Sequence, residues 1–210
     1  MESGVVQAAA DYAQEILGAE GFRYVTAVVA NCKMLTVELG EQGEDTAALD
    51  MQALIIAGYL HNISTAAHGF RDHHRMSAQM AVEFLRELDV PDERIKKVEQ
   101  AILMHTTAIE PDQRESVPLE SRILYDADKL GRLSGLAVVT SLIEFGARYP
   151  NHAVTGEVLA AILRHIEERF VELYQSLNTA PARDRSREKF GNTLAFLDGV
   201  MEHLNDATPV

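Results

Sequence analysis

The sequence predicts an all-α protein, and three observations support this class. Apolar residues recur at helical spacing along most of the chain, as at Ala78, Ala81, Leu85 and Leu88, which are three or four residues apart. The breaks between such segments are short and rich in glycine, proline or polar residues. No stretch alternates between apolar and polar residues as a half-buried strand would. We therefore expect a helical bundle of about nine helices.

The helix boundaries follow from these breaks. Glycines at 18 and 21 separate the first two helices, and Gly40 and Gly43 stop the second. Glu44 and Asp45 suit the N-terminus of the third, because acidic residues are favoured there. The expected helices are 4–18, 20–39, 46–61, 73–88, 91–105, one that starts near 118 and includes 123–130, 133–148, 155–177 and 181–204, with a loop at 63–72 and a break or bend at 178–181.

Length and composition predict one domain. With 210 residues, 47% of them hydrophobic, the chain can bury a core of ordinary size. We expect a single domain over 1–210, with a core at about 20–150 and C-terminal helices at about 155–204 packed on it.

Charge and targeting features restrict the classes of partner and the location. The net charge of −13 disfavours a nucleic-acid polymer or an anionic membrane as partner, because either requires a basic surface. The single cysteine, Cys32, is typical of a reducing cytosol. The N-terminus lacks the positive start of a signal peptide, and no apolar run approaches the roughly 18 residues of a membrane span. We expect a cytoplasmic protein, and its size suggests a homodimer on base rates alone.

Four polar side chains fall on faces that helical spacing predicts to be buried. His61 shares a face with Leu54, Ala57 and Gly58 at the end of an apolar helix. His74 shares a face with Ala78, whereas its neighbour His73 is predicted to point elsewhere. The list is completed by His105, on the face of Ile95, Val98 and Ile102, and by Asp128, on the face of Leu124 and Ala127.

These four residues together favour a metal or phosphate site. A single buried histidine is more often bonded to a backbone carbonyl. Burying an ionised carboxylate without a partner costs several kcal/mol, and a shared cation would remove that cost. We expect His61, His74, His105 and Asp128 to converge on one interior site, and the alternative is a hydrogen-bonded core network.

The order of these motifs resembles the HD-domain superfamily of metal-dependent phosphohydrolases. The matching segments are Leu60-His61-Asn62-Ile63, His73-His74-Arg75-Met76-Ser77-Ala78, the run from Ala101 to His105, and Asp126-Ala127-Asp128-Lys129-Leu130. The region after 168 is similar to the C-terminal part of one bacterial subfamily of small HD proteins, so the resemblance covers about 20–204. It implies a fold in which a histidine, a His-Asp doublet and a later aspartate hold a divalent metal that activates water.

Two of the implied ligands differ in this sequence. His61 matches the doublet's histidine and Asp128 the later aspartate, but the doublet's aspartate is Asn62, which would be a weak ligand or a group that orients water. A neutral carboxamide binds a hard cation more weakly than a carboxylate does. The first histidine is missing, because no histidine precedes His61. One alignment places Tyr24 at that position and another places Gly21 there.

The resemblance assigns further roles to basic and imidazole side chains. His74 and His105 occupy places that bind a second metal or meet phosphate in some branches of the superfamily. Arg75, Lys129 and Arg132 lie beside these positions as candidate phosphate contacts, and the alternative is that they are solvated or paired, as Arg132 could be with Asp128 four residues earlier. Tyr24 is a further candidate for contact with a substrate.

The resemblance leaves two functions open. The implied cofactor is a divalent metal (Mn, Mg, Co, Ni or Fe), bound weakly or not at all. One function is a phosphohydrolase acting on a phosphorylated small molecule such as a nucleotide. The alternative is a catalytically degenerate HD protein that binds a ligand or partner without turnover.

Overall fold

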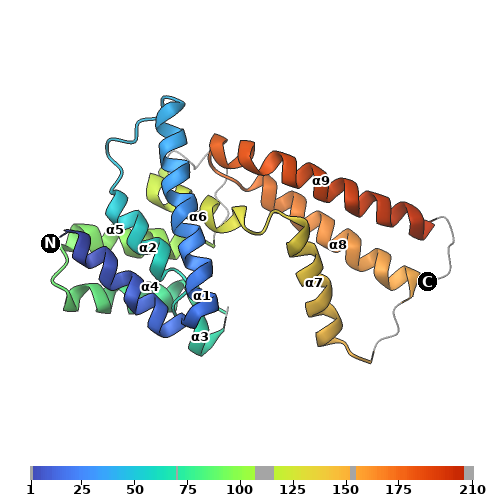
Figure 1. Ribbon diagram of the computed structural model, residues 1–210, viewed down its shortest axis with the longest axis horizontal. Helices are drawn as coiled ribbons and strands as arrows, with labels where there is room; N and C mark the ends of the chain where they lie inside the picture. Colours follow the sequence, from blue (N-terminus) through green and yellow to red (C-terminus); the bar gives the residue numbers. More distant parts are fainter. Residues whose placement is uncertain (1, 70, 107–115, 152–154, 206–210) are drawn as a thin grey trace. The chain divides into compact units, whose positions relative to one another are not determined.

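Every secondary-structure element in the described part of the chain is a helix, which confirms the all-α prediction. The computed structural model describes residues 2–69, 71–106, 116–151 and 155–205. The helices are α1 (Glu2–Glu41), α2 (Met51–Leu60), α3 (Thr65–His68), α4 (His73–Glu87), α5 (Asp92–Met104), α6 (Leu119–Leu130), α7 (Gly135–Arg148), α8 (Gly156–Gln175) and α9 (Ala180–Asn205) (Figure 1).

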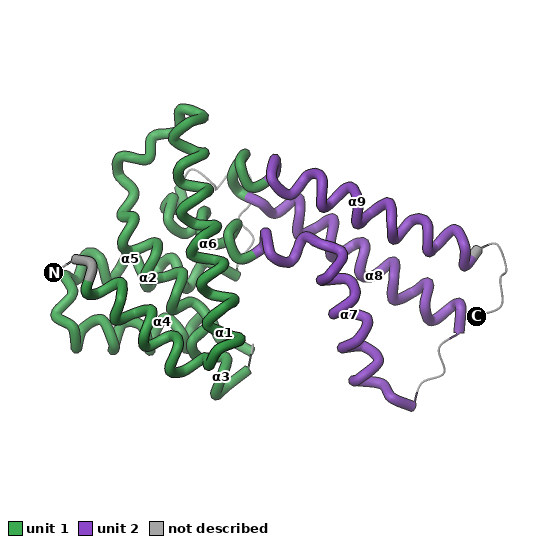
Figure 2. The backbone as a smooth tube through the Cα atoms, viewed as in Figure 1, with its two compact units in different colours: residues 1–128, 178–182 green, residues 129–177, 183–210 purple. Residues whose placement is uncertain are grey.

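The chain divides into two compact units (Figure 2). The first contains residues 1–128 and 178–182, and the second contains 129–177 and 183–210. The residues that the sequence analysis places in the candidate site belong to the first unit, except Lys129 and Arg132. The single-domain arrangement stays a prediction.

The first two predicted helices are joined in α1. Gly18 interrupts the helical geometry with φ 66° and ψ −176°, so two helical segments meet there at a kink. A positive φ is accessible to glycine at little cost because glycine has no Cβ. The break predicted near Gly18 is therefore a kink between two helical segments.

The predicted start of the third helix at 46 is wrong, because α2 begins at Met51. Asp50 is the N-cap, and its carboxylate accepts hydrogen bonds from the backbone N–H groups of Gln52 and Ala53. The same carboxylate accepts a hydrogen bond of 2.8 Å from Nε of Arg94 on α5. A side-chain cap satisfies N–H groups that the helix leaves without partners, so it fixes the helix start.

Close packing places the C-terminal end of α2 in the core of the first unit. A Cβ at Gly58 would lie 2.8 Å from Cγ2 of Val29, so α2 approaches α1 more closely than a larger residue allows. Helix α2 also packs against α5, which packs against α4. His61, directly after α2, is fully buried as a result.

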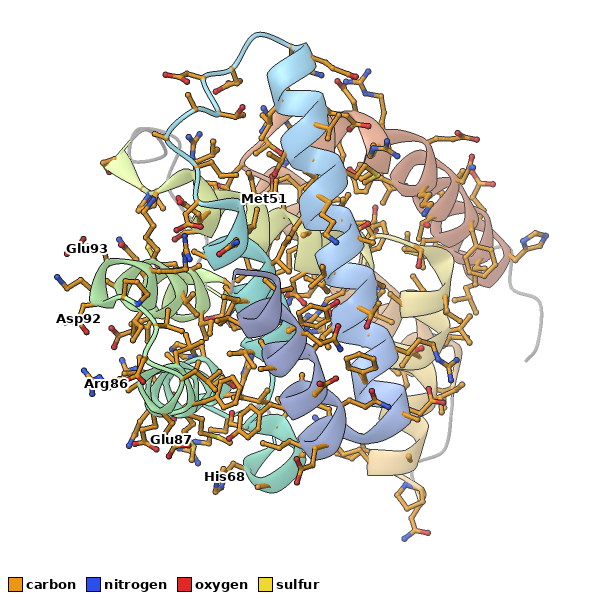
Figure 3. The ribbon with its side chains drawn as sticks, turned by 60° about the vertical axis from the view of Figure 1, so that its left-hand side comes forward. Met51, His68, Arg86, Glu87, Asp92 and Glu93 are labelled. Atoms are coloured by element: carbon orange, nitrogen blue, oxygen red, sulfur yellow. The ribbon has the colours of Figure 1, made fainter. Side chains whose placement is uncertain are left out.

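A short helix and a charged outer edge complete the first unit. The predicted loop at 63–72 contains α3, none of whose residues is fully buried. Arg86 and Glu87 at the end of α4, and Asp92 and Glu93 at the start of α5, are exposed and extend outward (Figure 3).

The second unit is built from α7, α8 and most of α9. Val138, Leu163 and Leu197 form its buried core, one from each helix. The ring of Phe190 on α9 stacks on Phe170 of α8, with centroids 5.5 Å apart. Early residues of α9 thus pair with late residues of α8, so the two are separate, antiparallel helices.

In the described part of the chain no single helix has both the length and the apolar character of a membrane span, although α6 and α7 taken together as a bent pair meet that test.

Candidate functional site

His61 follows the last residue of α2, and its side chain is completely buried. Its Nδ1 lies 2.8 Å from the carbonyl oxygen of Gly58. Because a carbonyl can only accept, Nδ1 carries a proton and donates it. In the neutral imidazole, Nε2 is then the atom with a lone pair.

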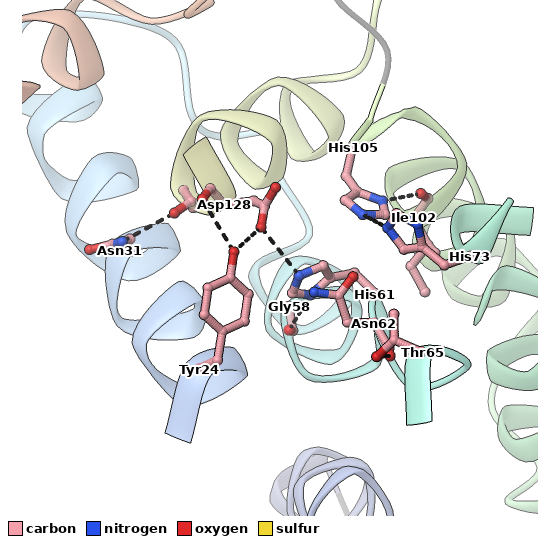
Figure 4. Close-up of polar contacts among 11 residues, drawn as sticks. Tyr24, Asn31, Gly58, His61, Asn62, Thr65, His73, Ile102, His105 and Asp128 are labelled. Carbon is pink, nitrogen blue, oxygen red and sulfur yellow. Dashed lines mark hydrogen bonds and ion pairs between the residues drawn. The ribbon is translucent and has the colours of Figure 1, made fainter. Parts of the chain in front are cut away.

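Asp128 and Tyr24 meet in front of this imidazole. Asp128 is 1% exposed on α6, and its Oδ1 lies 3.7 Å from Nε2 of His61. The hydroxyl of Tyr24 on α1 donates a hydrogen bond to the same Oδ1 (Figure 4). Beside this contact, Nδ2 of Asn31 donates to the carbonyl oxygen of Ala127 at 3.1 Å and ties α1 to α6. The structure therefore brings Tyr24, His61 and Asp128 together.

Asn62 follows His61 and is 5% exposed. Its carbonyl oxygen accepts hydrogen bonds from the backbone N–H and the hydroxyl of Thr65, at 3.0 and 2.7 Å, which hold the turn after α2. Its side-chain Oδ1 is buried and, like Nε2 of His61, has no hydrogen-bond partner among the described residues. Buried polar atoms are normally satisfied, so two unsatisfied atoms on adjacent residues suggest that another group binds there.

A second pair of imidazoles lies next to the first. Nε2 of His105, at the end of α5, lies 3.1 Å from Nε2 of His73, at the start of α4. The ring centroid of His105 is 4.9 Å from that of His61 and 5.1 Å from that of His73. Nδ1 of His105 donates to the carbonyl oxygen of Ile102, so in neutral rings His73 supplies the proton between the pair. The predicted burial of His105 is confirmed.

The predicted inward face of α4 is wrong by one residue at the start of the helix. His73 is buried, whereas His74 is only partly buried. The buried face includes Ser77, whose hydroxyl donates to the hydroxyl of Ser64 at 2.9 Å. The prediction of the buried face used apolar residues alone, so it left out Ser77, which is polar but lies on the inner face. The signal that could have found His73 is its position four residues before Ser77.

The basic residues named as phosphate contacts lie in different places. Arg75 is exposed and lines a groove of about 370 Å³ formed by α4 and α5, together with Arg86 and Leu103. Lys129 is buried and Arg132 is exposed. Both belong to the second unit, so their contact with a ligand bound in the first stays a prediction.

Asp126 anchors the segment that leads into α9, a role that the sequence analysis did not identify. Its buried carboxylate accepts hydrogen bonds from the backbone and side chain of both Asn178 and Thr179, at 2.7 to 3.2 Å. Burial raises the pKa of Asp126 to about 6, although these four hydrogen bonds act in the opposite direction.

Burial also raises the pKa of the Cys32 thiol, and the nearby Asp128 carboxylate adds to that effect. Cys32 is therefore a protonated packing residue.

HD-type proteins are helical, and a buried histidine at the end of one helix faces a buried aspartate from a later helix. This chain has these features. The family model for the HD domain matches residues 25–133. The chain belongs to the HD-domain family. No curated protein matches the sequence.

Solved structures share this fold over nearly the whole chain. The Lin1889 protein from Listeria innocua has a TM-score of 0.72 at 15% identity, covering 98% of both chains. YpgQ from Bacillus subtilis, in complex with ADP, has a TM-score of 0.68 at 15% identity and 96% coverage of both. A predicted HD superfamily hydrolase from an uncultured Thermotogales bacterium has a TM-score of 0.57 at 17% identity, covering 94% of this chain and 91% of its own. These similarities support a common fold.

HD hydrolases generally use divalent metals, and the residues present here fit such an ion poorly. Asp128 is the one carboxylate among Tyr24, His61, Asn62 and Asp128, and a phenol hydroxyl donates to the oxygen that faces His61. No group of three or more His, Cys, Asp or Glu side chains among the described residues has the arrangement of a metal site. The unsatisfied atoms of His61 and Asn62 could accept a ligand, but two neutral donors and one carboxylate form a weak set for a hard cation.

Proposed function

We propose that this chain is a degenerate HD-family protein that binds a phosphorylated small molecule, with a nucleotide as the first candidate, without metal-dependent hydrolysis. The observation that carries this proposal is the hydrogen bond from Tyr24 to Asp128. A phenol proton stands at the carboxylate oxygen that would otherwise be available to a cation.

The loss of metal chemistry follows from charge and geometry. A metal-dependent hydrolase needs a cation to lower the pKa of water and to neutralise phosphate charge in the transition state. Asn62 removes one negative charge from the ligand set implied by the family. In the alignment that places Tyr24 at the first histidine, an imidazole is replaced by a group that donates a hydrogen bond. Both changes reduce the affinity of the site for Mn or Mg.

Two observations support a retained binding role. Nε2 of His61 and Oδ1 of Asn62 are buried without hydrogen-bond partners in the described part of the chain, and a bound molecule would satisfy them. The similar structure of YpgQ holds ADP, which makes a nucleoside diphosphate the first ligand to test.

A weak metal-dependent phosphohydrolase is the second candidate, and the imidazole cluster favours it. His61 and His105 each donate Nδ1–H to a backbone carbonyl, which is the usual orientation of a histidine that binds metal through Nε2. His73 lies beside them, and the same three residues could face phosphate instead.

Calorimetry and a hydrolysis assay separate the two candidates. Purified protein would be titrated with ADP in EDTA and again with Mn, and elemental analysis would measure its metal content. Our proposal predicts ADP binding that does not require metal, together with no turnover in Mn, Mg, Co or Ni. Hydrolysis that depends on a metal and is lost in Asp128→Asn would support the second candidate instead.

A further inference from the structure

Nε2 of His61 and Oδ1 of Asn62 are buried on adjacent residues without a hydrogen-bond partner in the described part of the chain, and both atoms can accept hydrogen bonds. Nδ1 of His61 is committed to the carbonyl oxygen of Gly58, so the neutral ring offers only a lone pair at Nε2. Oδ1 of Asn62 is an amide oxygen and can only accept. Their complement is a group that donates hydrogen bonds.

The neighbouring carboxylate adds to this preference. Oδ1 of Asp128 lies 3.7 Å from Nε2 of His61, whereas the length of a hydrogen bond seldom exceeds about 3.2 Å. The hydroxyl of Tyr24 donates a hydrogen bond to this oxygen, and Figure 4 marks both this bond and the contact of the same oxygen with His61. A donor placed between the imidazole and the carboxylate could bond to both.

A phosphate group does not match these atoms. Its charged oxygens are acceptors, so they would leave Oδ1 of Asn62 and Nε2 of a neutral His61 without donors, and they would repel an ionised Asp128 carboxylate. A divalent cation would remove this mismatch, but the donor set described above binds such an ion weakly.

We infer that the ligand enters the site between His61, Asn62 and Asp128 with a hydrogen-bond donor, an exocyclic amino group of a nucleobase, and not with its phosphate. This inference rests on the proposed function, since it takes the ligand to be a nucleotide. Asn62 and His61 then distinguish ligands that carry such a donor from ligands that lack it. The phosphates then lie outside this cluster.

A matched pair of nucleotides tests the inference in metal-free buffer. The full chain in EDTA is titrated calorimetrically with ADP and with purine riboside 5′-diphosphate, which has hydrogen in place of the 6-amino group. Because the analogue leaves buried acceptors without a donor, we expect it to bind at least about tenfold more weakly than ADP. Adenosine should show the same preference over purine riboside, and pyrophosphate should not compete with adenosine.

Variants of Asn62 assign the preference to this site. Asn62→Leu removes the acceptor at similar size and should reduce the preference for the amino group severalfold. Asn62→Asp keeps an acceptor and should retain the preference, which preserves the test if the leucine variant does not fold. Gln79→Leu, on an exposed position of α4, is the control and should behave as the unaltered protein.

The outcomes separate this inference from the proposed function. Equal affinities for ADP and its analogue, or a preference that persists unchanged in Asn62→Leu, would overturn the inference and leave nucleotide binding in place. Binding that requires Mn and follows the number of phosphates would also overturn it. No binding of any nucleotide would overturn both proposals.

Discussion

The hydroxyl of Tyr24 on α1 donates a hydrogen bond to Oδ1 of Asp128 on α6, a residue 104 positions later in the chain. The HD family implies a histidine at the position that one alignment gives to Tyr24, and the structure places this residue beside His61, with ring centroids 6.3 Å apart. In that alignment, the contact joins two positions that would share a metal in a complete site.

Replacing Tyr24 by phenylalanine should destabilise the protein. The change removes the hydroxyl that donates to a buried carboxylate, and the loss of such a hydrogen bond costs about 1 to 3 kcal/mol. Urea unfolding followed by circular dichroism measures the change in free energy. Tyr59→Phe is the control, because Tyr59 is partly buried and its ring stacks on Phe22. Equal decreases in the free energy of unfolding of the two variants would show that the hydrogen bond from Tyr24 to Asp128 does not stabilise the protein.

Replacing Gly58 by alanine should loosen the packing between α1 and α2. The added Cβ would approach Cγ2 of Val29 to 2.8 Å, so one of the helices must shift, at a cost of about 1 to 3 kcal/mol. Gly191→Ala on α9 is the matched control, since no atom lies within 4 Å of its Cβ and alanine favours a helix by up to about 1 kcal/mol. An unchanged unfolding midpoint in Gly58→Ala would contradict the close approach.

Asp126 should make stability depend on pH in the acidic range. Its pKa of about 6 in the folded protein lies above the ordinary aspartate value of 3.8, so the folded state binds the proton more tightly than the unfolded state. The stabilisation that protonation provides is complete below about pH 4 and is lost as the pH rises through about 6. A pKa difference of about 2 corresponds to about 3 kcal/mol.

The measurement compares the unaltered protein with Asp126→Asn at several pH values. Asparagine cannot titrate, and its amide N–H would face the N–H donors of Asn178 and Thr179, so this variant should be less stable throughout. The gap in free energy of unfolding should narrow as the pH rises from about 4 to about 7. Asp198→Asn, at an exposed position of α9, is the control. A gap that stays constant or widens would contradict the raised pKa.

Much of the fold could be predicted because it depends on local patterns. Apolar residues at helical spacing and glycine or proline at the breaks mark the helices, and the inward faces of α2, α5 and α6 place His61, His105 and Asp128 in the interior. These residues lie in or next to amphipathic or apolar helices whose buried side is the apolar side.

The remaining features depend on contacts between residues far apart in the sequence. The start of α2 is fixed by Asp50, which Arg94 holds from α5, and the acidic residues a few positions earlier give the wrong signal. His73 lies on the same buried face as Ser77, which is polar but donates a hydrogen bond to the hydroxyl of Ser64. Such partners appear only once the chain is folded.

The most direct test of the central claim, that Tyr24 and Asn62 together weaken the metal site, is the affinity for Mn²⁺ of a Tyr24→His, Asn62→Asp double variant. We expect weak binding by the unaltered protein and by each single variant, because each retains one defect. The double variant should gain more affinity than the sum of the single changes, as expected for residues that share one ion, and Asp128→Asn in the same background should abolish the gain.

Calorimetric titration with MnCl₂, after circular dichroism and a cooperative melt have shown that each variant folds, gives these affinities. We expect the double variant to bind Mn²⁺ at least about tenfold more tightly than the additive expectation, a coupling of about 1.4 kcal/mol. A dissociation constant below about 1 µM for the unaltered protein, or a folded double variant that binds Mn²⁺ no better than the unaltered protein, would contradict the claim that Tyr24 and Asn62 weaken the metal site.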